Sequence, residues 1–128
     1  MTRTIVPALL LLMASPAWAH HAYGDIARDQ TVVISGVIEH INFANPHVLL
    51  QVRADDGVVY TVEWGNLTQL ARDGVTRATF QMGERLIVTG NPHRDPEKRL
   101  VTLLTEVRRP ADGWQWTRWT KGVVQSPR

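Results

Sequence analysis

The pattern of apolar and polar positions along the chain predicts five β-strands and one short helix. Runs rich in Val and Ile, several with alternating apolar and polar residues, predict strands over residues 31–43, 48–53, 58–64, 85–90 and 100–107. Between the third and fourth runs, Asn66 and Gln69 form a capping-box pattern, and Gly74 is a helix stop. The chain is therefore expected to be mostly β.

Turn residues order these elements into a fold. Gly36 interrupts the first run, which predicts a bulge or a sharp bend. Asp56-Gly57 predicts a hairpin with a type I′ turn between the second and third strands. Three strands, a helix and two strands is the order of an OB-fold. We therefore predict an all-β, five-stranded OB-fold-like Greek-key barrel with one short helix between strands 3 and 4; a five-stranded meander is the alternative.

The first residues have the pattern of a secretory signal peptide. Arg3 precedes an apolar stretch over residues 5–13, and Ala17-Trp18-Ala19 is typical of a cleavage site. The apolar stretch is too short for a transmembrane helix. We predict a signal peptide over 1–19, a barrel domain over 20–109 and a Trp-rich basic tail over 110–128. This organisation predicts a periplasmic or secreted protein without a transmembrane segment after cleavage.

Composition excludes several classes of function. The chain has no cysteine, so disulfides, thiolate metal sites and thiol catalysis are excluded. Without the signal peptide, 128 − 19 = 109 residues remain, and these carry 13 basic and 12 acidic side chains. Nucleic-acid binding depends on clustered Lys and Arg. A net charge of +1 therefore predicts no nucleic-acid partner.

One tripeptide occurs twice and is the best sequence candidate for a site. Asn45-Pro46-His47 follows the first predicted strand, and Asn91-Pro92-His93 follows the fourth. In an OB-fold the corresponding loops flank the ligand surface. We therefore predict ligand-binding roles for Asn45, His47, Asn91, His93 and Trp64, with both His rings on one rim of the barrel. The alternative is turn chemistry alone, because Asn-Pro is typical of a turn start.

The histidines also suggest a metal site. Cleavage after Ala19 would give His20 a free amine beside its imidazole, and His21 follows directly. Amine and neutral imidazole nitrogens are good copper or zinc ligands. We predict His20, His21, His47 and His93 as metal ligands, with copper or zinc as the metal. The alternatives are a mobile arm for the first pair and turn chemistry for the second.

The chain resembles an uncharacterised family of small exported bacterial proteins. The residues that carry the resemblance are His20-His21, residues 33–37 around Gly36, Asn45-Pro46-His47, Val62-Glu63-Trp64, and residues 83–92. The resemblance implies an OB-like fold and export, and it implies no activity. At the level of the fold the chain is also similar to the periplasmic haem chaperone of cytochrome c maturation, which uses a His in a C-terminal extension. No His follows His93 here, so haem chaperoning is not implied.

Three functional hypotheses follow. The chain has no Gly-x-Ser-x-Gly motif and no assembled catalytic pattern, so we expect a non-enzymatic periplasmic OB-fold binding module with an unknown small ligand. The second hypothesis is a copper- or zinc-binding protein. The third is docking to a periplasmic protein through the tail tryptophans Trp114, Trp116 and Trp119. We expect these tryptophans instead to fold back over the open end of the barrel, since exposed aromatic side chains are unfavourable.

Overall fold

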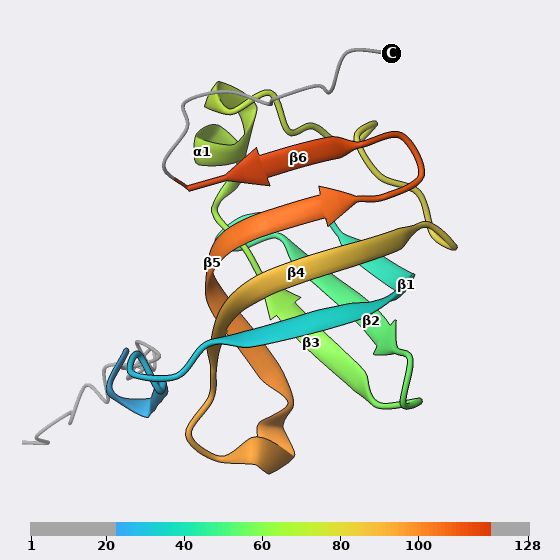
Figure 1. Ribbon diagram of the computed structural model, residues 1–128. Helices are drawn as coiled ribbons and strands as arrows, with labels where there is room; N and C mark the ends of the chain where they lie inside the picture. The colour runs from blue at the N-terminus through green and yellow to red at the C-terminus, as the bar shows by residue number, and fades with distance from the viewer. Residues whose placement is uncertain (1–22, 119–128) are drawn as a thin grey trace, which may run out of the picture.

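The computed structural model describes residues 23–118, which form six strands and one α-helix (Figure 1). The elements are η1 (Tyr23–Asp25), β1 (Val32–Asn42), β2 (Leu49–Ala54), β3 (Val59–Glu63), α1 (Leu67–Arg72), β4 (Arg85–Pro92), η2 (Pro96–Lys98), β5 (Leu100–Arg109) and β6 (Trp114–Thr117). In this part of the chain, no helix has the length and apolar character needed to cross a membrane.

Five of the strands close into a barrel, with α1 between β3 and β4. Strand β1 pairs antiparallel with both β2 and β4, and β3 and β4 continue the sheet on either side to β5. A short parallel seam closes the barrel, where Thr61 of β3 pairs with Leu100 of β5 and Val62 pairs with Val101. The predicted five-stranded barrel is confirmed, and the pairing of β1 with β4 rules out the meander.

Strand β1 serves both halves of the barrel because of Gly36. At this residue β1 is paired on both edges, with Ala54 of β2 and with Leu86 of β4. A Cβ atom at position 36 would lie 2.2 Å from the carbonyl oxygen of Arg53, so only glycine permits this approach of β1 to β2. The irregularity in pairing lies between Ile38 and His40, two residues later than the sequence pattern suggested.

The hairpin between β2 and β3 has a different turn from the one predicted. The amide of Gly57 donates to the carbonyl of Ala54, and the amide of Ala54 donates to the carbonyl of Val58. Gly57 has φ +87°, whereas Asp56 is not among the residues with positive φ. A type I′ turn needs positive φ at both central residues. The type I′ prediction is therefore wrong, and the loop has a single left-handed residue at Gly57.

The helix begins as its sequence signal predicts. The side chain of Asn66 accepts a hydrogen bond from the amide of Gln69, and the side chain of Gln69 accepts one from the amide of Asn66. The predicted capping box is thus confirmed. Leu70 is the buried residue of α1 and anchors the helix to the core.

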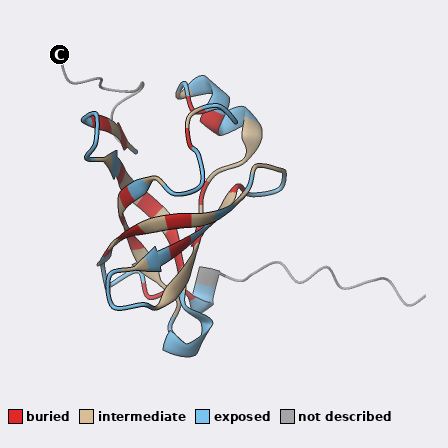
Figure 2. Ribbon diagram, turned by 90° about the vertical axis from the view of Figure 1, so that its right-hand side faces the viewer, coloured by how far each residue is buried: buried red, intermediate tan, exposed pale blue. Residues whose placement is uncertain are grey.

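The core fills the barrel and continues under α1 and β6. Figure 2 shows buried residues alternating with partly exposed ones along the strands, as expected where one face of a sheet is packed. Val52, Val62, Leu86, Val88 and Val101 have essentially no exposed surface. They stabilise the barrel by removing apolar area from water.

The tail up to Arg118 belongs to the sheet. Strand β6 pairs antiparallel with β5, and its side chains Trp114 and Trp116 are 7% and 6% exposed. The ring of Trp116 packs edge-on against Trp64 at 5.0 Å between centroids, and Trp114 packs edge-on against Phe80, also at 5.0 Å. The prediction that the tryptophans fold back is confirmed for Trp114 and Trp116. Being buried, these two do not form an exposed docking surface; Trp119 lies outside the described residues.

Candidate functional site

The first Asn-Pro-His tripeptide packs against the segment that leads into α1. The Nδ1 atom of His47 lies 3.3 Å from the carbonyl oxygen of Trp64. The Asn45 side chain accepts a hydrogen bond of 3.0 Å from the amide of Leu67. The Asn45–Pro46 peptide bond is cis. The loop thus holds the start of the helix and places His47 beside it.

The second tripeptide secures the β4–β5 loop and the N-terminal arm. The side-chain amide of Asn91 donates to the carbonyl of Gln30. The amide of His93 donates to the carbonyl of Leu100, and His93 also forms an isolated bridge with Ile26. The Nδ1 atom of His93 accepts a hydrogen bond of 2.9 Å from the amide of Asp95. These contacts are those of a structured turn.

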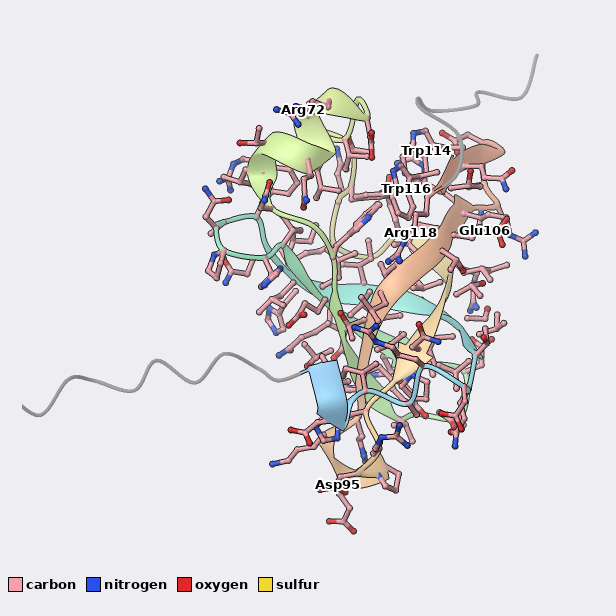
Figure 3. The ribbon with its side chains drawn as sticks, turned by 90° about the vertical axis from the view of Figure 1, so that its left-hand side faces the viewer. Arg72, Asp95, Glu106, Trp114, Trp116 and Arg118 are labelled. Atoms are coloured by element: carbon pink, nitrogen blue, oxygen red, sulfur yellow. The ribbon has the colours of Figure 1, made fainter. Side chains whose placement is uncertain are left out.

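The two His side chains do not share a rim. His93 pairs with Leu100, which is opposite Thr61 on β3, whereas His47 contacts Trp64, three residues further along. Three residues of strand span about 10 Å. The two rings line different hollows, and Figure 3 shows Asp95, near His93, at the opposite end of the molecule from Arg72 on α1. The prediction of one shared rim is therefore wrong. The β1–β2 loop follows the C-terminal end of β1, whereas the β4–β5 loop follows the end of β4 that is paired with the start of β1.

Residues 23–118 contain no group of three or more His, Asp or Glu side chains arranged to hold a metal ion. His47 and His93 thus do not belong to such a group within the described residues. His20 and His21, the other predicted ligands, lie outside the described residues, so their role stays a prediction.

A hollow of the described surface lies between α1 and β6, and we call it the α1–β6 hollow. Figure 1 shows both elements at the same end of the barrel. The hollow has a volume of about 510 Å³ and opens to solvent. Its walls are His47, Glu63, Trp64, Gly65, Gln69, Leu70, Arg72, Asp73, Thr102, Leu103, Leu104, Trp116 and Arg118. Two of the predicted ligand-binding residues, His47 and Trp64, are therefore part of it.

A bulge in β5 forms one wall of the α1–β6 hollow. Thr89 of β4 pairs with Glu106 of β5, but Asn91 pairs with Thr102, so β5 uses two more residues than β4 over this stretch. Leu103, within the bulge, has φ +49°, a conformation that is unfavourable for a residue with a side chain. The neighbouring Thr102 is 5% exposed and donates a 3.1 Å hydrogen bond to the Glu63 carboxylate. The bulge thereby fixes Glu63 from across the seam.

Strand β6 forms the opposite wall and is joined directly to α1. The indole Nε1 of Trp116 donates a 3.0 Å hydrogen bond to Asp73, the residue that ends the helix. The Nε atom of Arg118 donates a 2.9 Å hydrogen bond to the carbonyl of Leu104 in the bulge. In Figure 3, Trp116 and Arg118 lie on the side of the β5–β6 ladder that faces the helix. Asp73 and Arg118 are therefore each held in place by a hydrogen bond to a strand residue.

Charged groups of both signs line the α1–β6 hollow without pairing. Arg72 and Arg118 are cations, and Glu63 and Asp73 are anions. None of the four takes part in an ion pair within residues 23–118. In the same wall, the indole Nε1 of Trp64 is buried and has no hydrogen-bond partner in this range. The hollow thus keeps both charge and hydrogen-bonding capacity that the described fold does not use.

A second hollow, of about 330 Å³, lies at the β4–β5 loop. Its walls include Tyr60, His93, Arg94 and Arg99, together with apolar residues of β1 and β5. Asn91, the remaining predicted ligand-binding residue, is engaged by Gln30 at its edge. This hollow is smaller than the first and has no tryptophan in its walls. It is also lined by Asp95 and Arg99, neither of which takes part in an ion pair within residues 23–118.

A family model described as Family of unknown function (DUF6152) matches residues 8–101 of the chain. The chain belongs to this family. No curated protein matches it. The DUF6152 protein is thus a small β-barrel domain whose family carries no assigned function. The match ends at Val101, so Thr102, the bulge and β6 lie beyond the matched residues, whereas His47, α1 and Glu63 lie within them.

The sequence alone did not identify most of the α1–β6 hollow of this DUF6152 protein. Arg72, Asp73, Thr102, Trp116 and Arg118 carry no local motif and lie on different elements. The available signal was the alternation of Trp114 and Trp116 with polar Gln115 and Thr117, which is typical of a half-buried strand. A strand predicted from this alternation would have placed the tail beside the barrel, but the prediction would not have placed it beside α1.

Proposed function

We propose that this DUF6152 protein is an exported, non-enzymatic binding module that holds a small ligand in the α1–β6 hollow. The observation that carries the proposal is the set of unpaired charges, Arg72, Arg118, Glu63 and Asp73, around one hollow with tryptophan walls. Small-molecule sites are typically concave and mostly apolar, with a few polar groups that fix orientation. The α1–β6 hollow is concave and combines apolar residues with polar and charged ones, in a more even proportion than is typical.

Two further features support a ligand at this place. Leu103 keeps a left-handed backbone conformation that costs on the order of 1–3 kcal/mol, and such residues cluster at functional sites. Trp64 keeps a buried indole donor without a partner in residues 23–118. Buried donors normally find an acceptor, so the unpaired donor is a position where a ligand or a bound water would contribute.

The non-enzymatic part of the proposal rests on how the acidic groups are held. Glu63 accepts a hydrogen bond from Thr102, and Asp73 accepts one from Trp116. Each carboxylate is thus fixed by a neutral framework donor, with no His or second carboxylate hydrogen-bonded to it within residues 23–118. This arrangement favours a fixed recognition surface over a proton-transfer pair. Export is proposed from the charged, apolar and cleavage-site pattern of residues 1–19.

The proposal is tested by mapping binding on the protein with nuclear magnetic resonance. The labelled protein is titrated with separate sets of neutral, anionic, cationic and zwitterionic small molecules. We expect at least one set to shift the indole N–H signals of Trp64 and Trp116, while the backbone amides of Arg94, Asp95 and residues 97–99 in the β4–β5 loop serve as the internal control. If no set shifts the indole signals, or if the shifts are confined to the β4–β5 loop, the α1–β6 hollow is not the binding site.

A further inference from the structure

We infer that the ligand of the α1–β6 hollow is a zwitterion with an apolar group, the chemistry of a free α-amino acid with an apolar side chain. This inference rests on the proposed function, because it assigns a ligand class to the same hollow. It depends on which charges line the hollow, on how each is held, and on the apolar surface between them.

The two arginines that line the α1–β6 hollow are suited to a carboxylate. Arg118 donates its Nε to the carbonyl of Leu104, which orients the guanidinium and leaves its terminal nitrogens for a ligand. Arg72, on the last turn of α1, has no hydrogen-bond or ion-pair partner in residues 23–118. Guanidinium groups bind carboxylates through charge-assisted and often bidentate hydrogen bonds. A carboxylate in the hollow would therefore have a guanidinium donor available at Arg72 or at Arg118.

The two carboxylates that line the hollow are suited to an ammonium group. One oxygen of Glu63 is engaged by Thr102, and one oxygen of Asp73 is engaged by Trp116. The second oxygen of each carboxylate is left to accept a hydrogen bond from a ligand. An ammonium group offers three donors and no acceptor, which matches either of these carboxylates.

The balance of charge selects a zwitterion over a simple ion. Two arginines and two carboxylates give 2 − 2 = 0 for these four groups. A purely anionic ligand would meet Glu63 and Asp73 unfavourably, and a purely cationic ligand would meet Arg72 and Arg118 unfavourably. A ligand with one charge of each sign satisfies both sides.

The apolar part of the ligand would lie against the floor of the α1–β6 hollow. Leu70, Trp116 and Leu104 are 1%, 6% and 2% exposed, and all three contribute surface to the hollow. Trp64 also lines the hollow and lies edge-on to Trp116. An aliphatic or aromatic side chain placed on this surface would be removed from water, which favours binding by its buried area.

The test uses the full chain and three free amino acids, L-leucine, L-methionine and L-phenylalanine. None of them contains an indole, so the fluorescence of the protein's tryptophans and the Trp64 and Trp116 indole N–H signals report binding directly. We expect saturable binding of at least one. Its methyl ester, which lacks the carboxylate, and its N-acetyl derivative, which lacks the ammonium group, should each bind about 10-fold or more weakly.

Variants assign each charge to a side of the ligand. In Arg118→Gln, the ratio of the affinity for the amino acid to the affinity for its methyl ester should fall. The reason is that the carboxylate of the amino acid has lost the guanidinium that binds it. In Asp73→Asn, the ratio of the affinity for the amino acid to the affinity for its N-acetyl derivative should fall, because the ammonium group has lost a carboxylate partner. The side-chain amide oxygen of the new Asn can still accept the hydrogen bond from Trp116. Lys98→Gln and Glu97→Gln remove the same charges on the exposed β4–β5 loop and should leave all affinities unchanged.

The outcomes separate this inference from the proposed function. If the methyl ester or the N-acetyl derivative binds as tightly as the amino acid, or if only other probe classes shift the indole signals, the ligand is not a zwitterion and the hollow remains a binding site. If no probe of any class shifts them, the proposed function fails and this inference fails with it. The affinities of the native protein for the amino acid, its methyl ester and its N-acetyl derivative show whether the ligand is a zwitterion, even where a variant does not fold.

Discussion

Replacing Gly36 with alanine tests how closely β1 and β2 approach in the barrel. An alanine Cβ would lie 2.2 Å from the carbonyl oxygen of Arg53, 2.7 Å from its carbonyl carbon and 2.9 Å from the Cα of Ala54. All three are backbone atoms, so no side-chain rotation relieves the contact. Ordinary carbon–oxygen contacts begin near about 3.3 Å. The two strands would therefore have to separate locally by about 1 Å.

The expected cost follows from this separation. Overpacking in a close-packed interior costs about 1–3 kcal/mol. Separation at a residue that is paired on both edges also weakens neighbouring ladder hydrogen bonds, each worth about 1 kcal/mol. We expect Gly36→Ala to lower the free energy of unfolding by about 2–4 kcal/mol. For a domain of this size, that corresponds to a fall in Tm on the order of 10–20 °C.

Urea and thermal unfolding, followed by tryptophan fluorescence, measure the change. Gly24→Ala is the matched control, because no atom lies within 4 Å of a Cβ at that position and its φ is not positive. It should change the free energy of unfolding by less than about 0.5 kcal/mol. A Gly36→Ala protein as stable as the control would show that β1 and β2 do not approach as closely as described.

Substitutions at three further positions test other contacts. The hydrogen bond from Arg109 lowers the pKa of Asp112 below its ordinary 3.8, so Asp112→Asn should be less stable than the native protein at neutral pH. The difference in the free energy of unfolding between the two proteins should disappear as the pH falls through that lowered pKa. Urea titrations at neutral pH and at a pH below that pKa measure it, and an equal difference at the two pH values would contradict the prediction. Trp116→Phe removes the donor to Asp73 and should cost about 1–2 kcal/mol in urea unfolding, unless that hydrogen bond is absent in solution. Asn66→Ala removes the helix cap and should cost about 1 kcal/mol, whereas Asn66→Gly should cost only a few tenths; equal losses would argue against capping.

The elements that were predictable are those whose signals are local. The apolar runs located β1 to β5, and the capping box at Asn66 located α1, because each signal lies within the element it specifies. The type of the turn at Asp56-Gly57 was predicted wrongly, because the Asp-Gly sequence is compatible with more than one hairpin loop. The backbone φ angles of these two residues distinguish the loops, and they are not given by the sequence. Strand β6 was missed because a four-residue strand after Pro110 and Gly113 reads as an irregular tail.

The candidate site was not predictable in the same way. Thr102 reaches Glu63 across 39 residues of sequence, and Trp116 reaches Asp73 across 43. Such contacts depend on the β3–β5 pairing and on the return of β6, which no local pattern encodes. The repeated Asn-Pro-His tripeptide was a conspicuous local signal, and it led to two separate loops with mainly structural contacts.

The parallel seam between β3 and β5 also bears on the order in which the chain can fold. Thr61 and Leu100 are 100 − 61 = 39 residues apart, and the seam consists of two residue pairs. The entropy of closing so long a loop must be offset by few hydrogen bonds, so pairings of this kind form late. The β1–β2 and β2–β3 hairpins can form before the chain extends to residue 100. The α1–β6 hollow cannot, because part of its wall comes from residues 102–118. We expect the amide of Thr61, which donates to the carbonyl of Arg99, to exchange with solvent before that of Val52. The surface that would recognise a ligand is thus assembled last, and it exists only in a molecule that has finished folding.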